Sequence, residues 1–257
     1  MPGKSPLALP ADVVYQYDGS FAGFLCCIHQ SVYNRQLPLA IYPEADCQPS
    51  LFPVVEVETN REKAEKVQGS IPSKICPAAL ELVETVFLSC LAEKERALLI
   101  FLLLGYRQGG RVMNMLGHPD VAPVLEAAKH LQGEAHLLKG FVRFADYGGV
   151  LAAAITPKNF VLPFLANHFE ARYSDENFMI FDKTHRAALV YENRQSRVIA
   201  LQHVEFPELG EEEKQYRSLW KQFYNTVAIE ARYNPKCRMT HMPKRYWENM
   251  VEMQDFL

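Results

Sequence analysis

The pattern that most constrains the fold is a long helical stretch with strand-like segments on both sides of it. From Cys76 to about Leu138, apolar residues recur with helical spacing, with breaks expected at Gly105, at Gly109-Gly110 and at Gly117–Asp120. The strand patterns are grouped before and after this stretch and do not alternate with its helices. Because such grouping is typical of α+β proteins, the sequence predicts an α+β fold with a mainly antiparallel sheet, segregated helices and a central helical layer.

The remaining elements follow from alternation, turn residues and caps. The predicted strands are 13–17, 54–58, 141–147, 150–155, 177–182, 186–192 and 197–203. The predicted helices outside the central layer are 20–34, 157–173 and 211–233. Gly148-Gly149 is typical of a hairpin turn, and Thr156-Pro157 of a helix start. The Pro-rich segment 37–53 is expected to be a loop.

Length and composition indicate an ordinary globular protein. With 257 residues and 49% apolar content, the chain can bury a core as one large domain or two small ones. We expect a flexible N-terminus over residues 1–11 and a single α+β globular domain over residues 12–257, ending in a basic helix and tail. The longest apolar run, Ala97–Leu104, has eight residues, far short of the roughly 20 that span a bilayer, so no membrane association is expected.

The cysteine pattern bears on the compartment. The six cysteines of the chain show no CxxC pair and no Cys/His pairing. Several of them lie in apolar helical patterns, where a free thiol behaves as a small hydrophobic group. We therefore expect reduced thiols and a cytoplasmic protein.

Positive charge is concentrated near the C-terminus. Between Lys214 and Trp247 there are eight Lys or Arg residues and one acid, Glu230, whereas the whole chain has a net charge of −3. On a helical wheel, four cations share one side of the predicted helix and five apolar residues share the other. The cations are Lys214, Arg217, Lys221 and Arg232, and the apolar residues are Tyr216, Leu219, Trp220, Phe223 and Val227. A nucleic acid or another polyanion is the partner that such a stripe predicts, the alternative being an ordinary solvated face.

The tail that follows mixes cations with aromatic residues. The cations are Lys236, Arg238, Lys244 and Arg245, and the nearby rings include Tyr246 and Trp247. Aromatic rings stack on unpaired bases while cations hold the phosphate backbone, so we expect these four cations and Tyr246 to contact nucleic acid. The alternative, favoured for Trp247, is that the rings fill the core where the chain ends.

Two polar residues fall on the apolar side of the helix predicted from Pro157. His168 and Arg172 lie one turn apart there, and Asp146 and Asp182 stand near the ends of neighbouring predicted strands. Because a buried charge needs a partner, we expect Arg172 to pair with one of these aspartates. This pair of Arg172 with an aspartate is called the clasp below. It is either structural or the centre of a catalytic pocket whose candidate residues are His168, Arg172, Asp146 and Asp182.

Motifs for common cofactors do not occur. The sequence contains no GxGxxG, Walker A, HExxH or GxSxG pattern, and its eight histidines show no ligand spacing with Cys or a carboxylate. No cofactor and no metal site is therefore predicted.

Several segments carry a family resemblance over nearly everything from about residue 12 onward. They are 15–21, 141–144 with 149–153, 160–163, His168-Phe169 with Arg172, 178–185 and 242–247. On these, the chain resembles an uncharacterised family of bacterial proteins labelled probable DNA metabolism proteins. The resemblance implies kinship to a domain fused ahead of uracil-DNA-glycosylase-like domains, and a gene neighbour that is a radical-SAM protein of DNA repair or modification. It transfers no catalytic residues.

Three interpretations follow. The first is an accessory protein of DNA metabolism or repair that binds DNA, a radical-SAM partner, or both through its basic C-terminal segment. The second is an enzyme of the same pathway with a pocket around His168 and Arg172. The third is a scaffold for the radical-SAM partner that does not bind DNA.

Overall fold

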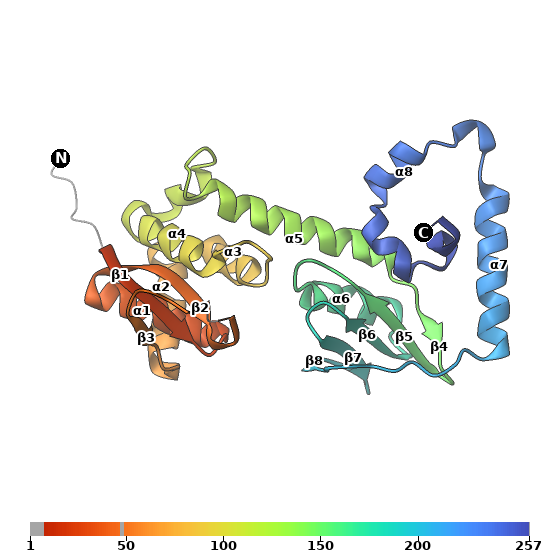
Figure 1. Ribbon diagram of the computed structural model, residues 1–257, viewed down its shortest axis with the longest axis horizontal. Coiled ribbons are helices and arrows are strands. Elements are labelled where there is room, and N and C mark those ends of the chain that lie inside the picture. The colour runs from red at the N-terminus through yellow and green to blue at the C-terminus, as the bar shows by residue number, and fades with distance from the viewer. Residues whose placement is uncertain (1–7, 47–48, 257) are drawn as a thin grey trace. The chain divides into compact units, whose positions relative to one another are not determined.

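The chain forms two compact units. The computed structural model describes residues 8–46 and 49–256, and contacts within the chain separate residues 1–131 from residues 132–257. Each unit has its own sheet, labelled in Figure 1. We expected one globular domain over residues 12–257, and the contacts of the chain fall into two compact units, each with its own sheet. The units are called unit 1 and unit 2 below.

Unit 1 contains a three-stranded sheet in which all strands are parallel. Its order is β2-β1-β3, and helix α1 connects β1 to β2. The bounds are β1 Leu9–Tyr17, α1 Phe21–Asn34, β2 Gln36–Pro43 and β3 Val54–Glu56, with a short 3-10 turn, η1, at Glu44–Asp46. Two expectations were wrong here: β2 lies in the predicted loop, and β1 includes residues 9–11 of the predicted flexible end. Residues 1–7 of that end lie outside the described residues.

A polar cluster determines where α1 begins. The Ser20 hydroxyl accepts a hydrogen bond from the Gly23 amide at 2.9 Å, and Asp18 accepts from Ser20 and from Thr59. A Cβ atom on Gly23 would lie 2.2 Å from Asp18 Oδ1. The close approach of Asp18 therefore requires glycine at this position.

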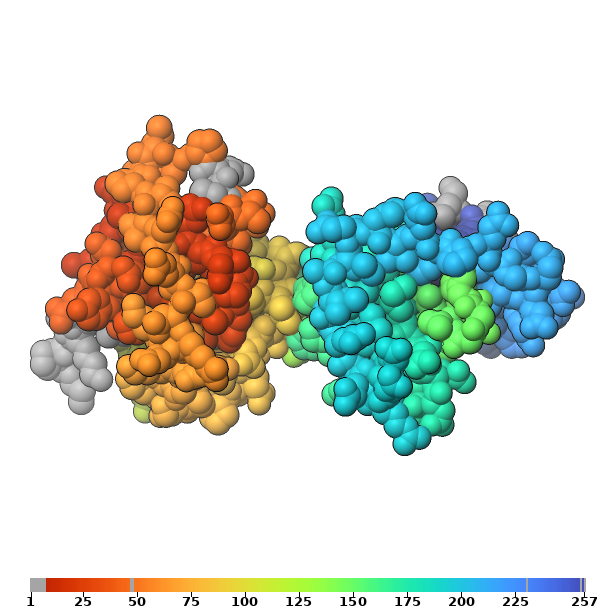
Figure 2. All heavy atoms as spheres, turned by 90° about the horizontal axis from the view of Figure 1, so that it is seen from below, coloured from red at the N-terminus to blue at the C-terminus, as the bar shows by residue number. Residues whose placement is uncertain are grey.

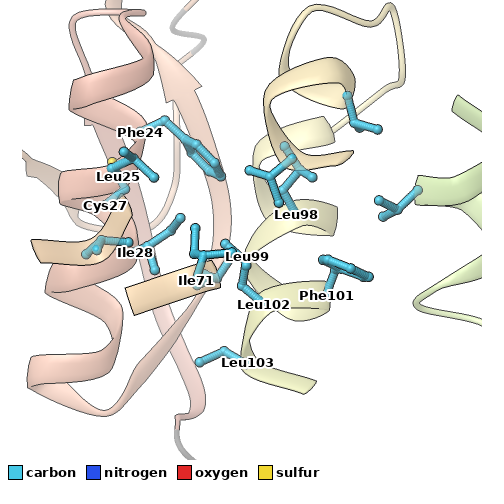
Figure 3. Close-up of a cluster of buried hydrophobic side chains, with 14 of the residues drawn as sticks. Phe24, Leu25, Cys27, Ile28, Ile71, Leu98, Leu99, Phe101, Leu102 and Leu103 are labelled. Carbon is cyan, nitrogen blue, oxygen red and sulfur yellow. The ribbon is translucent and has the colours of Figure 1, made fainter. Parts of the chain in front are cut away.

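Helices complete unit 1. They are α2 Arg61–Lys74, α3 Pro77–Phe87, α4 Lys94–Gln108 and the 3-10 segment η2 Gly109–Asn114, followed by α5 Ala122–Phe141, which continues into unit 2. Figure 3 shows Ile71 of α2 between α1 and α4, beside Leu99 and Leu102. Gly105 lies within α4, so the helix break predicted at this glycine is not observed. A Cβ atom on Gly105 would lie 2.6 Å from Ile75 Cδ1. This glycine therefore allows Ile75 to pack closely against α4.

Unit 2 contains a five-stranded mixed sheet with the order β4-β5-β6-β7-β8. Strands β5 and β6 are parallel and are connected by α6, whereas the other neighbours are antiparallel. The bounds are β4 Ala145–Asp146, β5 Val150–Ile155, α6 Leu162–Arg172, β6 Asn177–Asp182, β7 Ala187–Glu192 and β8 Gln195–Ala200. The α+β class is confirmed, but the sheet of unit 1 is parallel, so the mainly antiparallel description holds only for unit 2.

The first strand and the crossover helix of unit 2 differ from their predicted bounds. The hairpin turn is confirmed, since Gly148 and Gly149 have positive φ between β4 and β5. However, α5 extends to Phe141, so only Ala145–Asp146 remains of the predicted strand 141–147. The crossover helix starts at Leu162 and not at Pro157, because Glu134 holds the backbone amides of Lys158 and Asn159.

The C-terminal segment consists of helices and 3-10 turns. They are α7 Glu211–Val227, η3 Glu230–Arg232, α8 Pro235–His241, η4 Lys244–Asn249 and η5 Val251–Phe256. Helix α7 packs against η5. It ends at Val227, several residues before the predicted end at 233. None of the helices in the described part of the chain has the length and apolar character required to cross a membrane.

Candidate nucleic-acid interface

Helix α7 presents to solvent the side that the sequence predicts to be buried. Leu219 is 59% exposed, Phe223 56% and Trp220 41%. The half-buried positions of this helix are Glu213, Arg217, Lys221 and Tyr224, which include two of the predicted phosphate-binding cations. The expected orientation, with Trp220 and Phe223 in the core, is therefore wrong. In Figure 2, α7 forms the blue outer surface of unit 2.

A hydrogen bond accepted by Glu213 connects this side of α7 to unit 2. Arg217 Nε lies 2.8 Å from Glu213 Oε1, and the other carboxylate oxygen of Glu213 accepts a hydrogen bond from the Asp146 amide at 3.3 Å. Because Asp146 belongs to β4, the first turn of α7 is connected to the edge of the sheet. Lys214 lies farther round the helix, is exposed and pairs with Glu211 at 2.7 Å.

A pocket of about 530 Å³ opens beside α7. Its cations come from four segments: Lys139 from α5, Arg143 from the chain after α5, Arg172 from α6 and Arg217 from α7. Its aromatic residues are Phe144, Phe169, Tyr173, Tyr216 and Trp220, and Glu213 is the one acid among its lining residues. The structure thus brings Arg217 of the predicted basic stripe together with Arg172 of the predicted clasp.

Arg143 organises one wall of this pocket. Its guanidinium contacts Glu252 at 2.6 Å and lies 5.7 Å from the centre of the Trp220 ring. Burial alone would raise the pKa of Glu252, but the hydrogen bond from Arg143, together with smaller favourable contacts, lowers this pKa below its ordinary value. Arg143 is therefore paired with Glu252, and its guanidinium packs against the Trp220 ring.

Arg172 does not form the predicted clasp. It is exposed, lies 5.8 Å from the centre of the Tyr173 ring, and has no ion pair within residues 8–46 and 49–256. Asp182 is fully buried and instead contacts His185 Nδ1 at 2.6 Å, while Asp146 accepts from the Gly149 amide at 2.7 Å. Each aspartate thus stabilises the turn that follows its own strand, and the expected pairing with Arg172 is wrong.

His168 lies close to two cations of the pocket. Burial, and then the charges of Lys139 and Arg172, lower the pKa of His168 below its ordinary value of 6.5. Its ring packs edge-on against Phe169, a lining residue. His168 therefore belongs to the neighbourhood of the pocket, although it is not among the lining residues and has no carboxylate partner in the described part of the chain.

Tyr246 belongs to a buried network centred on Glu134, which the exposed side chain of Arg245 also contacts. Tyr246 is 2% exposed and donates a hydrogen bond to Glu134 at 3.0 Å, and Arg245 lies 3.1 Å from the same carboxylate. Burial raises the pKa of Glu134, but the bonds from the Lys158 and Asn159 amides and from the Asn159 and Tyr246 side chains reverse this effect and lower it. The Tyr246 ring is therefore unavailable for stacking on a base, contrary to the prediction.

The other tail residues divide into packed and exposed positions. Trp247 is buried and donates to the Met242 carbonyl, which confirms that it fills the core. Arg238 is half-buried among the rings of Tyr233, Trp247 and Phe256. Arg232, Lys236 and Lys244 are exposed, as is Arg245.

Sequence patterns did not identify Lys139, Arg143, Tyr173 and Trp220 as residues of the candidate interface. The sequence pattern places Trp220 in the core, and Arg143 in a strand of which only Ala145–Asp146 forms. One signal was present: Lys139 and Arg143 are four residues apart at the end of a helix, where cations are favoured. That signal does not reveal that α7 passes nearby.

Metal ligands do not cluster in the described part of the chain: no group of three or more His, Cys, Asp or Glu side chains there could hold a metal ion. Comparison with known proteins gives one family match, to a domain of unknown function, DUF4130, over residues 92–252. No curated protein and no solved structure matches the chain. The match covers more than half of the sequence and includes every lining residue of the pocket beside α7. The chain therefore belongs to the DUF4130 family.

Proposed function

We propose that the protein is an accessory module of DNA metabolism or repair and that unit 2 binds unpaired DNA at the pocket beside α7. The observation that carries this proposal is the combination of four cations with solvent-facing aromatic rings around one cavity. Cations attract the phosphate backbone, and aromatic rings stack on bases that are not paired. Paired bases are already stacked and cannot use the rings.

Two of the four pocket cations are available to bind a phosphate. Glu252 offsets Arg143, and Glu213 offsets Arg217. Among the described residues, neither Lys139 nor Arg172 forms an ion pair. We assign phosphate binding to Lys139 and Arg172, and a positioning role to Arg143 and Arg217.

Two rings are placed to receive a base. Tyr216 and Trp220 are exposed side chains that line the pocket, and Arg143 lies against the Trp220 ring. The cavity volume of about 530 Å³ falls in the range of roughly 300–1,000 Å³ that is usual for small-molecule sites. A single nucleotide of a DNA strand fits such a volume. The exposed cations Arg232, Lys236 and Lys244 would hold flanking phosphates.

Binding to matched oligonucleotides tests the proposal. The protein is titrated with a short single strand and with the same sequence as a duplex, and affinity is measured by fluorescence anisotropy. We expect the single strand to bind more tightly, and Arg172→Ala and Trp220→Ala to weaken its binding. Arg197→Ala is the matched control, because Arg197 is an exposed cation on β8, at the sheet edge opposite β4. Equal affinity for both DNAs, or equal loss in the control, contradicts the proposal.

The alternative of an enzyme rests on His168. Its lowered pKa keeps the imidazole neutral near pH 7, and a neutral imidazole can accept a proton. If the pocket is catalytic, His168→Ala should leave the melting temperature nearly unchanged and abolish the cellular phenotype of the gene. An intact phenotype with a folded His168→Ala protein rejects this alternative.

The family resemblance adds a partner to the proposal. We propose that the protein delivers DNA to a radical-SAM protein of DNA repair or modification encoded beside it. Co-purification of the two proteins with and without DNA tests this idea, together with the activity of the partner in the presence and absence of this chain. If no complex forms and the partner is fully active alone, the delivery role is rejected.

A further inference from the structure

One apolar face of α7 is exposed to solvent in the described part of unit 2. It consists of Tyr216, Leu219, Phe223 and Val227, each between 56% and 68% exposed, and is called the apolar seam below. The helix packs on unit 2 through a different side, the one that carries Glu213 and Arg217. Exposed apolar faces of this kind mark interaction sites in soluble proteins.

The spacing of the apolar seam is that of a helix pair. Its residues follow one another at intervals of three or four, which is the repeat that keeps a stripe facing a second helix. Trp220 stacks on Phe223, with ring centres 5.8 Å apart, and so widens the apolar seam near its middle. The partner that this surface fits is therefore another helix with a complementary apolar stripe.

The charges at the two ends of α7 indicate which helix this is. Its first turn carries Glu211, Glu212 and Glu213, whereas the exposed cations Arg232 and Lys236 follow its C-terminal end. A second copy laid antiparallel places the acids of each helix near the cations of the other. A parallel copy would bring like charges together at both ends, which is unfavourable.

We propose that two copies of the chain associate through α7 in antiparallel orientation, with Leu219 and Phe223 of each helix near the two-fold axis. Isologous contacts of this kind are the commonest basis of homodimers. Leu219, Phe223 and Val227 do not line the DNA pocket, so pairing leaves its cations in place. Tyr216, however, belongs to both the apolar seam and the pocket lining, and Trp220 borders both, so dimerisation would compete with base stacking and is tested without DNA.

The dimer should be weak. A helix of 17 residues is about 25 Å long at 1.5 Å per residue, which is short for an interface of the usual size. We expect dissociation constants in the micromolar range. Sedimentation velocity without DNA, from about 1 to 200 µM protein, covers the transition from monomer to dimer.

Two seam variants and a control test the contact. Leu219→Glu should give a monomer over the whole range, and Leu219→Ala, which preserves helix propensity, should weaken dimerisation by about tenfold or more. Ser218→Glu is the control: Ser218 is exposed on α7 away from the apolar seam, so its variant should dimerise like the unchanged protein. A monomeric unchanged protein at every concentration overturns the proposal, and so does an undiminished Leu219→Ala dimer.

Charge reversal tests the antiparallel orientation. One variant carries Glu211→Lys and Glu212→Lys, and a second carries Arg232→Glu and Lys236→Glu. In each homodimer, like charges would meet at both ends of the helix pair, so each variant alone should be monomeric. Mixing the two should restore a dimer, detected by a mass tag on one of them. Failure of the mixture to associate overturns the antiparallel arrangement.

Discussion

Arg172 of α6 and Arg217 of α7 line the same pocket, although the sequence places them in separate predicted sites. Arg217 reaches the pocket because its partner Glu213 is hydrogen-bonded to the Asp146 amide of β4. Arg172 lies at the end of α6, where its side chain is exposed and forms no ion pair with the described residues. One residue of the predicted basic stripe and one residue of the predicted clasp thus line the same cationic, aromatic pocket.

Replacement of Glu134 should destabilise unit 2. Glu134→Ala removes the buried acceptor of the Lys158 and Asn159 amides and of the Tyr246 hydroxyl. We expect a loss of about 3–5 kcal/mol in the free energy of unfolding, the usual cost of breaking a buried charged network. Urea unfolding followed by tryptophan fluorescence measures it, since both tryptophans, Trp220 and Trp247, lie in unit 2. The exposed Glu176→Gln is the control; a loss below about 1 kcal/mol would contradict the role of Glu134.

Unit 2 should lose stability in acid through Glu134 and Glu252. The pKa of each is lowered below its ordinary value of 4.5 in the folded state. The unfolded state therefore binds more protons in acid, so the stabilisation is present above about pH 4.5 and is lost as the pH falls through the folded pKa values. Unfolding curves recorded from pH 7 to pH 3 should show this decline. Glu252→Gln should flatten it, and a decline of unchanged steepness would refute the assignment to this residue.

The pKa of His168 should respond to its cationic neighbours. Burial lowers this pKa first, and Lys139 and Arg172 lower it further by charge repulsion. Arg172→Gln should therefore raise the pKa of His168 in an NMR pH titration, and Lys139→Gln should do the same. His29 of unit 1 is the internal reference, because its lowered pKa has other causes, burial with Lys63 and Lys66. A His168 titration that neither variant shifts would show that the cations lie farther away.

In unit 1, Tyr17→Phe should reveal the value of a buried hydrogen bond. The Tyr17 hydroxyl donates to Glu95 at 3.0 Å, and burial, with Glu95 beside it, raises the pKa of this hydroxyl. Because Glu95 is itself buried, removal of the hydroxyl should cost about 1–3 kcal/mol. Hydrogen exchange of β1 amides measures it without reference to unit 2. Tyr33→Phe, at an exposed position, should have no effect, and equal protection in both variants would contradict the prediction.

Local patterns predicted most elements, and long-range contacts caused the errors. Strands β5, β6 and β7 lie within a residue of their predicted bounds, because each is a short apolar run ended by turn residues. By contrast, the start of α6 depends on Glu134, more than 20 residues away, which holds the Lys158 and Asn159 amides that would have opened the helix. Periodicity cannot report such a contact.

The orientation of α7 is the clearest example in the candidate site. Its amphipathic pattern was recognised correctly, but the rule that the apolar side faces the core gave the wrong side. The side that packs is connected to unit 2 by the hydrogen bond that Glu213 accepts from the Asp146 amide, and α7 also packs against η5. Such contacts depend on where β4 lies, which the sequence pattern alone does not specify.

The salt dependence of single-strand binding tests the central claim most directly. Affinity for a short DNA single strand is measured over a series of salt concentrations, for the unchanged protein and for Arg172→Ala. Each phosphate contact contributes about 0.7 to the slope of log affinity against log salt for single strands. We predict that Arg172→Ala lowers this slope by about that amount and weakens binding. An identical slope and affinity in the variant would contradict the claim that DNA binds at the pocket beside α7.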